Sequence, residues 1–162
     1  MPPASDPASA RIPVRPPGRG ISASLSSMMN SIRPMLMFSG EHHGQAEEAV
    51  SFYIETFPDS RLTAIEKYGP GETDPEGTVK AASFVLNGRG FMAMDSAFPH
   101  AFNFTPSISF YVNVDDLSEF DELVAGLTEG GQALMPPDDY GIGRRFAWVA
   151  DRFGVTWQVH CG

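Results

Sequence analysis

The sequence has little of several features that mark particular classes of protein. It contains one cysteine, Cys161, so no disulfide can form within the chain, which predicts a reducing compartment such as the cytoplasm. No apolar run approaches the ~20 residues of a membrane-spanning helix. Lysine and arginine number only 11 against 20 aspartates and glutamates, which gives a formal net charge of −9. Because an acidic surface repels phosphate backbones, we do not expect nucleic acid as a partner, and the lack of a spanning run predicts no membrane partner.

The N-terminal region lacks the apolar periodicity of a folded segment. Residues 1–30 contain six prolines before position 18 and three arginines against one aspartate, so this stretch is basic whereas the rest of the chain is acidic. Such a segment buries too little apolar surface to offset the entropy of ordering it. We therefore predict a disordered leader over residues 1–32 and a single folded domain over residues 33–162.

Residues 33–95 carry the pattern of a β-α-β-β-β unit. A helix is expected over QAEEAVSFYIETF, because its apolar residues recur at the spacing of one buried helix face: Ala46, Val50, Tyr53, Ile54 and Phe57. Asn87-Gly88 is typical of a two-residue hairpin turn. Apolar and alternating runs predict four strands, at residues 34–38, 61–68, 78–86 and 89–94.

Residues 107–160 repeat this order. Strands are expected at residues 107–114, 132–134, 144–150 and 155–160, with a loop at MPPDDYG. Asp115-Asp116 predict the start of a helix whose apolar residues share one side: Leu117, Phe120, Val124 and Leu127. The repeat predicts an α+β fold of two βαβββ modules, residues 33–95 and 107–160, with curled, mostly antiparallel sheets around a cavity.

Three stretches are similar to one protein family: GQAEEAVSFYIETFPDSR, PHAFNFTPSISFYVN and DRFGVTWQV. Together and in this order they span residues 34–160. The sequence resembles the PhnB-like branch of the vicinal-oxygen-chelate superfamily, which includes glyoxalase I, bleomycin-resistance proteins and extradiol dioxygenases. It departs from that branch by an insertion, Glu41-His42-His43. The resemblance implies sheets curled around a small-molecule cavity and, together with open sheet edges, predicts a homodimer.

Strand alternation and the resemblance together give candidate ligand-binding residues. A side chain that faces the cavity alternates with one that packs under the helix. On the fifth strand Ile108, Phe110, Val112 and Val114 are expected under the helix. On the last strand Val155, Trp157 and Val159 are expected there, which leaves Thr156 and Gln158 for the cavity. On the fourth strand we expect Ala93 and Phe91 in the cavity, and on the first strand Pro34, Leu36 or Phe38. The candidate set is Phe38, Phe91, His100, Ser109, Tyr111 and Gln158.

His100 is the candidate catalytic residue. It follows Pro99 in the linker between the modules, inside a stretch that carries the resemblance. Its imidazole could act as an acid, a base or a hydrogen-bond donor at the mouth of the cavity. It could equally serve only to hydrogen-bond the linker backbone, and both interpretations stand.

The resemblance also bears on metal binding. Metal-dependent relatives place a His, Glu or Gln ligand on the first and last strand of each module, and of the matching positions only Gln158 could bind an ion. A divalent ion held by protein usually needs about three N, O or S ligands. We therefore predict no metal and no cofactor. An alternative ligand set combines His42 or His43 with His100, Gln158 and Asp95, although adjacent side chains on an extended loop point apart.

The leading functional interpretation is a small-molecule binding protein, or a metal-free enzyme, with an apolar cavity. One alternative is a metal-dependent enzyme of the lyase, isomerase or dioxygenase type. A further alternative is demethylubiquinone methyltransferase activity, the label that many members of this branch carry. The sequence has no Gly-rich strand-to-helix loop for a nucleoside cofactor, which argues against that label.

Overall fold

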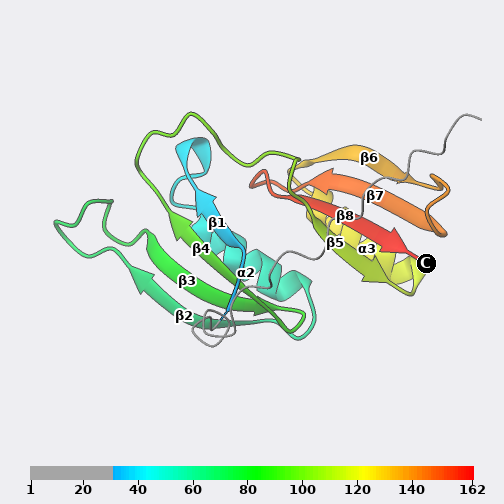
Figure 1. The fold of residues 1–162 in the computed structure, drawn as a ribbon, viewed down its shortest axis with the longest axis horizontal. Helices are drawn as coiled ribbons and strands as arrows, with labels where there is room; N and C mark the ends of the chain where they lie inside the picture. Colours follow the sequence, from blue (N-terminus) through cyan, green and yellow to red (C-terminus); the bar gives the residue numbers. More distant parts are fainter. Residues whose placement is uncertain (1–30) are drawn as a thin grey trace, which may run out of the picture. The chain divides into compact units, whose positions relative to one another are not determined.

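Two α-helices among the described residues each lie across one face of a four-stranded sheet (Figure 1). The structure, a computed structural model, describes residues 31–162, of which Arg33–Gly162 form one compact unit. The disordered leader predicted at residues 1–32 lies outside the described residues except for its last two positions. Within the described part of the chain, no helix is both long and apolar enough to cross a membrane.

The first module forms a sheet in the order β1-β4-β3-β2. Strand β1 is parallel to β4, and the other neighbours are antiparallel. The turn between β3 and β4 has the two left-handed residues of a type I′ hairpin, Asn87 (φ 45°) and Gly88 (φ 73°). The elements are β1 (Met35–Phe38), the 3-10 helix η1 (Gly40–His42), α2 (Ala46–Thr56), β2 (Arg61–Lys67), β3 (Val79–Leu86) and β4 (Arg89–Asp95).

The second module repeats this topology in the order β5-β8-β7-β6, with β5 parallel to β8. Its elements are β5 (Phe110–Val114), α3 (Leu117–Thr128), β6 (Gln132–Asp138), β7 (Arg145–Ala150) and β8 (Thr156–Cys161). Each module is thus a β-α-β-β-β unit, and the predicted α+β fold of two such units is confirmed.

The two helices begin with their free N–H groups bonded in different ways. The Asp116 side chain caps α3, accepting hydrogen bonds from the backbone of Ser118 and Glu119. The N-cap of α2, Gln45, makes no such side-chain bond. Instead Asp95, at the end of β4, accepts from the backbone of Gly44 and Ala46 and, through its other oxygen, from Val79. This carboxylate is fully buried and ties α2 to its sheet.

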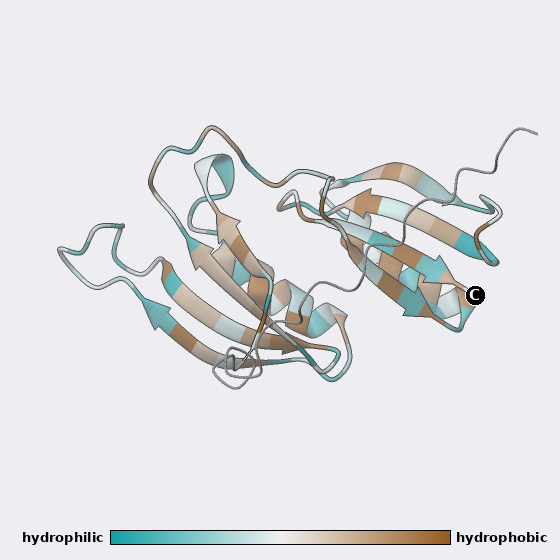
Figure 2. Ribbon diagram, viewed as in Figure 1, coloured by the Kyte–Doolittle hydropathy of each residue, from teal (hydrophilic) through white to brown (hydrophobic). Residues whose placement is uncertain are grey.

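Each sheet has one face under a helix and one open face. Figure 2 shows hydrophobic residues running along β1, β3 and β4, whereas the loop between β2 and β3 is hydrophilic. In the first module the helix-covered side holds the buried residues Leu36, Phe38, Phe84, Phe91 and Ala93. In the second, Val149, Trp157 and Val159 are buried with α3 residues Phe120, Val124 and Leu127. This side of each sheet forms the core.

Three local predictions are wrong. Strand β5 begins at Phe110, so Ile108 precedes it and is 73% exposed instead of packing under the helix. Leu117, expected on the buried side of α3, is exposed at the first turn. Strand β6 runs through Pro136-Pro137 to Asp138, where a loop was expected. An edge strand tolerates proline because one side of its backbone has no partner strand, and β6 is at the edge of its sheet.

Candidate functional site

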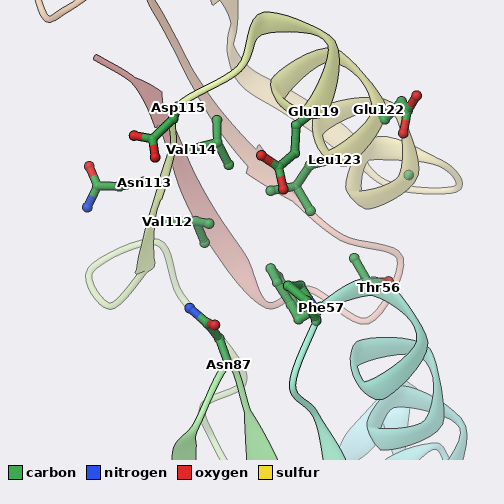
Figure 3. Close-up of a pocket in the computed structure, with 12 residues that line it drawn as sticks. Thr56, Phe57, Asn87, Val112, Asn113, Val114, Asp115, Glu119, Glu122 and Leu123 are labelled. Atoms are coloured by element: carbon green, nitrogen blue, oxygen red, sulfur yellow. The ribbon is translucent and has the colours of Figure 1, made fainter.

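A cavity lies beside strand β5 (Figure 3). It has a volume of ≈ 610 Å³, and a second cavity of ≈ 370 Å³ adjoins the same residues. The two share Phe57, Asn87, Val112 and Asn113, so we treat them as one cleft. The cleft is lined by β5, by the end of α2, by the β3–β4 turn and by one side of α3.

Aromatic residues from both modules meet at the inner end of the cleft. The Trp157 ring lies 4.9 Å from that of Phe57 and 5.2 Å from that of Phe110. Phe110 in turn meets Phe91 edge-on at 5.1 Å. All four side chains line the smaller cavity, and their packing gives it an apolar and fixed floor.

The outer part of the cleft is polar and mostly acidic. Asp115, Glu119 and Glu122 line the larger cavity, the last two projecting from α3 (Figure 3). Arg89 lines the smaller cavity, and the Asn87 and Asn113 side chains lie at the junction of the two. The cleft therefore offers an apolar floor, amide groups and carboxylates that would attract a positive charge.

A buried carboxylate holds the floor of the cleft in place. Asp151 Oδ2 accepts hydrogen bonds from Tyr53 Oη at 2.7 Å and from Trp157 Nε1 at 2.9 Å. Its Oδ1 accepts from the backbone of Phe153 and Val155. Burial raises the pKa of Asp151 above its usual value, against the opposing effect of these four donors. Burial, and the nearby Asp151, also raise the pKa of Tyr53 well above its usual value. Since Tyr53 belongs to α2, this network joins the two modules.

Two of the predicted ligand-binding residues meet in the cleft. Phe91 and Tyr111 both line the smaller cavity. Tyr111 is 51% exposed, whereas Phe91 is buried on the helix-covered side of its sheet. The remaining predicted residues, Phe38, His100, Ser109 and Gln158, do not line this cleft.

On β1 and β4 the prediction of which side chains face the helix is wrong. We expected Phe38, Phe91 and Ala93 on the open face of the sheet, yet Phe38 and Ala93 have no exposed surface and lie on the helix-covered side. The open face instead carries four methionines, paired across the two strands: Met35 with Met92, and Met37 with Met94. Both sides of these strands are apolar, so alternation could not show which side the helix covers.

On β8, and for Phe110 and Tyr111 on β5, the side chains face the sides of the sheet that the sequence predicted. Trp157 and Val159 are buried, whereas Tyr111 is exposed and Gln158 lies opposite it in the parallel pair. Ser109 precedes β5, and its hydroxyl is engaged by neighbours. Trp148 Nε1 donates to Ser109 Oγ at 3.0 Å, and Thr156 lies 2.6 Å away on the other side. Because the Thr156 hydroxyl donates to the carbonyl of Ile108, Ser109 must donate to Thr156.

The candidate catalytic residue, His100, lies in the linker between the modules. Its ring lies 5.3 Å from that of Phe98 and 5.0 Å from that of Phe102, tilted with respect to both. Its Nε2 lies 3.1 Å from the hydroxyl of Ser96. These neighbours all belong to the linker region, away from the residues that line the cleft.

The two adjacent histidines have different partners. His42 Nδ1 lies 2.9 Å from the Gln45 side-chain oxygen, and His43 Nε2 lies 3.9 Å from Asp74 Oδ2. Within residues 31–162, no three His, Cys, Asp or Glu side chains gather as a metal site. On the open face of β1 and β4 the available donors are methionine thioethers. These residues do not fit a hard divalent ion, which prefers oxygen and nitrogen ligands.

Several residues of the cleft were not among the predicted site residues. Phe57, Leu123 and Glu119 belong to helices or helix ends. Phe57 was expected on the buried face of the first helix, and Leu123 and Glu119 were given no role. The cleft forms only when the end of α2 lies near β5 of the other module. No periodicity within one module carries that information.

The comparisons with known proteins agree with the fold. A PhnB protein from Bacillus cereus, for which 3-demethylubiquinone-9 3-methyltransferase activity has been suggested, is 38% identical, with a TM-score of 0.77 over 82% of this chain and 100% of its own. Protein PA1353 from Pseudomonas aeruginosa is 29% identical, with a TM-score of 0.68 over 82% and 98% of the two chains. A glyoxylase/bleomycin resistance protein/dioxygenase domain from Frankia sp. EAN1pec shares the fold at 14% identity, with a TM-score of 0.55 over 83% and 98%.

No curated protein matches the chain. A protein-family model described as 3-demethylubiquinone-9 3-methyltransferase matches residues 30–160, which is most of the sequence. The family description names an activity, whereas the match itself concerns sequence and fold. The chain therefore belongs to this family, as does its PhnB-like relative, and it shares its fold with the glyoxylase/bleomycin resistance protein/dioxygenase domain.

Proposed function

We propose that the protein binds a small organic molecule in the cleft beside β5. The observation that carries the proposal is the pair of neighbouring cavities, ≈ 610 Å³ and ≈ 370 Å³, which share four lining residues and lie between residues of both modules. This volume falls in the range of small-molecule sites, about 300–1,000 Å³. The family's fold supports small-molecule binding as a class of function.

The lining of the cleft favours one class of ligand. Its floor of aromatic side chains would hold an apolar or aromatic body. The carboxylates of Asp115, Glu119 and Glu122 at the outer end would attract a positive charge. The proposed ligand is therefore an apolar molecule that carries an amine or another cationic group.

Thermal unfolding in the presence of aromatic amines tests the proposal. A panel of such compounds is added to the full chain at millimolar concentration, and a binder should raise Tm by mass action. In a Leu123→Trp variant the larger ring would fill the cleft from α3, and the rise should disappear. Leu117→Trp, on the same helix but outside the cleft, is the matched control and should keep it. A rise that survives Leu123→Trp would place the binding elsewhere and contradict the proposal.

The family description makes methyl transfer a second candidate. Calorimetry of the full chain with S-adenosylmethionine tests it directly. Saturable binding that Leu123→Trp abolishes would favour a methyltransferase using this cleft. The absence of binding heat would leave small-molecule binding without methyl transfer as the proposal.

We also propose that the protein is a homodimer. Strands β1 and β5 each have a single partner strand within the described residues, and open edges favour pairing with, or covering by, another chain. Sedimentation equilibrium at micromolar concentration should give twice the 17.6 kDa mass of one chain. A mass near that of one chain would contradict the dimer.

A further inference from the structure

The open face of the first sheet carries an array of four methionines. Met35 lies opposite Met92, and Met37 opposite Met94, in the parallel pair of β1 and β4. Residues two apart on a strand share a face, so all four side chains lie on the side away from α2. We call Met35, Met37, Met92 and Met94 the methionine quartet.

The quartet has the dimensions of a single site. Neighbouring strands lie about 4.8 Å apart, and residues two apart on a strand are separated by about 6.6 Å. Methionine has three rotatable bonds, so four side chains at the corners of such a rectangle can bring their sulfurs to one point. Met35 is 45% exposed and the other three are partly exposed, so an ion in solution could reach them.

The chemistry of the quartet is specific. A thioether is a soft, neutral donor, and such ligands select Cu(I) over hard divalent ions. Arg33 lies on the same face: its side chain runs beside Gly90, and its guanidinium donates to Ser83 Oγ at 3.3 Å. Four neutral sulfurs beside a fixed positive charge disfavour a doubly charged ion more than a singly charged one.

We propose that the methionine quartet is a binding site for a soft monovalent metal ion, Cu(I) or its analogue Ag(I). The site lies on the opposite side of β4 from Phe91, which lines the cleft. It is therefore separate from the proposed small-molecule site, so an experiment can contradict one proposal and leave the other standing.

Methyl NMR of the full chain tests the site with Ag(I), which needs no reducing agent. In protein labelled with methyl-¹³C methionine, chloride-free Ag(I) should shift the four quartet signals together and saturate near one equivalent. Each signal is assigned from its loss in a single Met→Leu variant. The signal of Met135, on β6 of the other sheet, should not move.

Three variants make the test decisive. A Met35→Leu/Met92→Leu double variant keeps the size and apolar character of the side chains but loses two sulfurs, so its affinity for Ag(I) should fall at least tenfold. Met135→Leu is the matched control and should bind as the wild type does. Single Met94→Leu protein, with three sulfurs left, should show an intermediate loss and serves if the double variant does not fold.

A thiolate ligand, the buried Cys161, is excluded by a Cys161→Ser variant. The four methionine shifts should persist in it. The proposal is overturned if the quartet signals stay in place with Ag(I), or if the double variant binds Ag(I) as tightly as the wild type. It is also overturned if Cys161→Ser alone abolishes binding.

Discussion

The two modules are alike under their helices and different on their open faces. In both, the parallel strand pair presents two cross-strand pairs to the open side. In the first module these are Met35 with Met92 and Met37 with Met94, all methionine. In the second they are Tyr111 with Gln158 and Asn113 with His160, all with polar groups. The same topology thus holds two chemically unlike surfaces.

The difference shows which part of each module is constrained by folding. A helix packed on a sheet requires apolar residues on that side, and both modules supply them. The open face has no such requirement, so its residues can differ without changing the fold. We infer that the open faces, and the cleft where the modules meet, are the places where function is set.

The largest expected effect separates the two faces of β8. Trp157 is 2% exposed and packs on Tyr53, Phe57 and Phe110, so Trp157→Ala should lower the free energy of unfolding by about 3–5 kcal/mol. The next residue, Gln158, lies on the open face, and Gln158→Ala should cost less than about 1 kcal/mol. Urea denaturation measures both. Equal losses would mean that β8 has no open face in solution.

The second prediction concerns the different starts of the two helices. Asp95→Ala would leave three backbone N–H groups, the buried ones of Ala46 and Val79 and that of Gly44, without their hydrogen-bond acceptor. We expect a loss of about 2–4 kcal/mol. Asp116→Ala removes only an exposed cap from α3 and should cost about 1 kcal/mol. Asp95→Asn, which keeps one acceptor oxygen, should recover part of the loss. A larger loss for Asp116→Ala would contradict this comparison.

The third prediction uses the network that joins the modules. Because burial raises the pKa of Asp151, the folded chain holds this proton more tightly than the unfolded chain. The contribution of Asp151 to stability is therefore fully present below about pH 3.8, its unfolded value, and is lost as the pH rises through the raised pKa. In Asp151→Asn the side chain does not titrate, so this pH-dependent loss of stability does not occur. The free energy of unfolding of the wild type minus that of the variant should fall with rising pH, and a difference that grows with pH would contradict the assignment.

The helix-covered faces could largely be predicted from the sequence, and the site could not. The alternation of β8 identified the buried positions Trp157 and Val159, because polar and apolar residues there occupy opposite sides. On β1 and β4 both sides are apolar, and Phe38 and Phe91 were assigned to the wrong face. The cleft depends on how the end of α2, at Phe57, meets β5 some fifty residues later. That distance lies beyond any local pattern, and the role of His100 stays a prediction.

The smallest expected effect comes from exchanging residues between the open faces. Met92 and Gln158 occupy matching places, on the last strand of each module and opposite its first strand. Met92→Gln and Gln158→Met should each change the free energy of unfolding by no more than about 0.5 kcal/mol, as for surface positions. Met92→Gln should nevertheless weaken Ag(I) binding, whereas Gln158→Met should leave it unchanged. A stability loss above about 1.5 kcal/mol would show that something covers the open face in solution. If that loss grew larger as the protein concentration rose, the cover would be a second copy of the chain, because association stabilises the wild type more than the variant and does so increasingly with concentration.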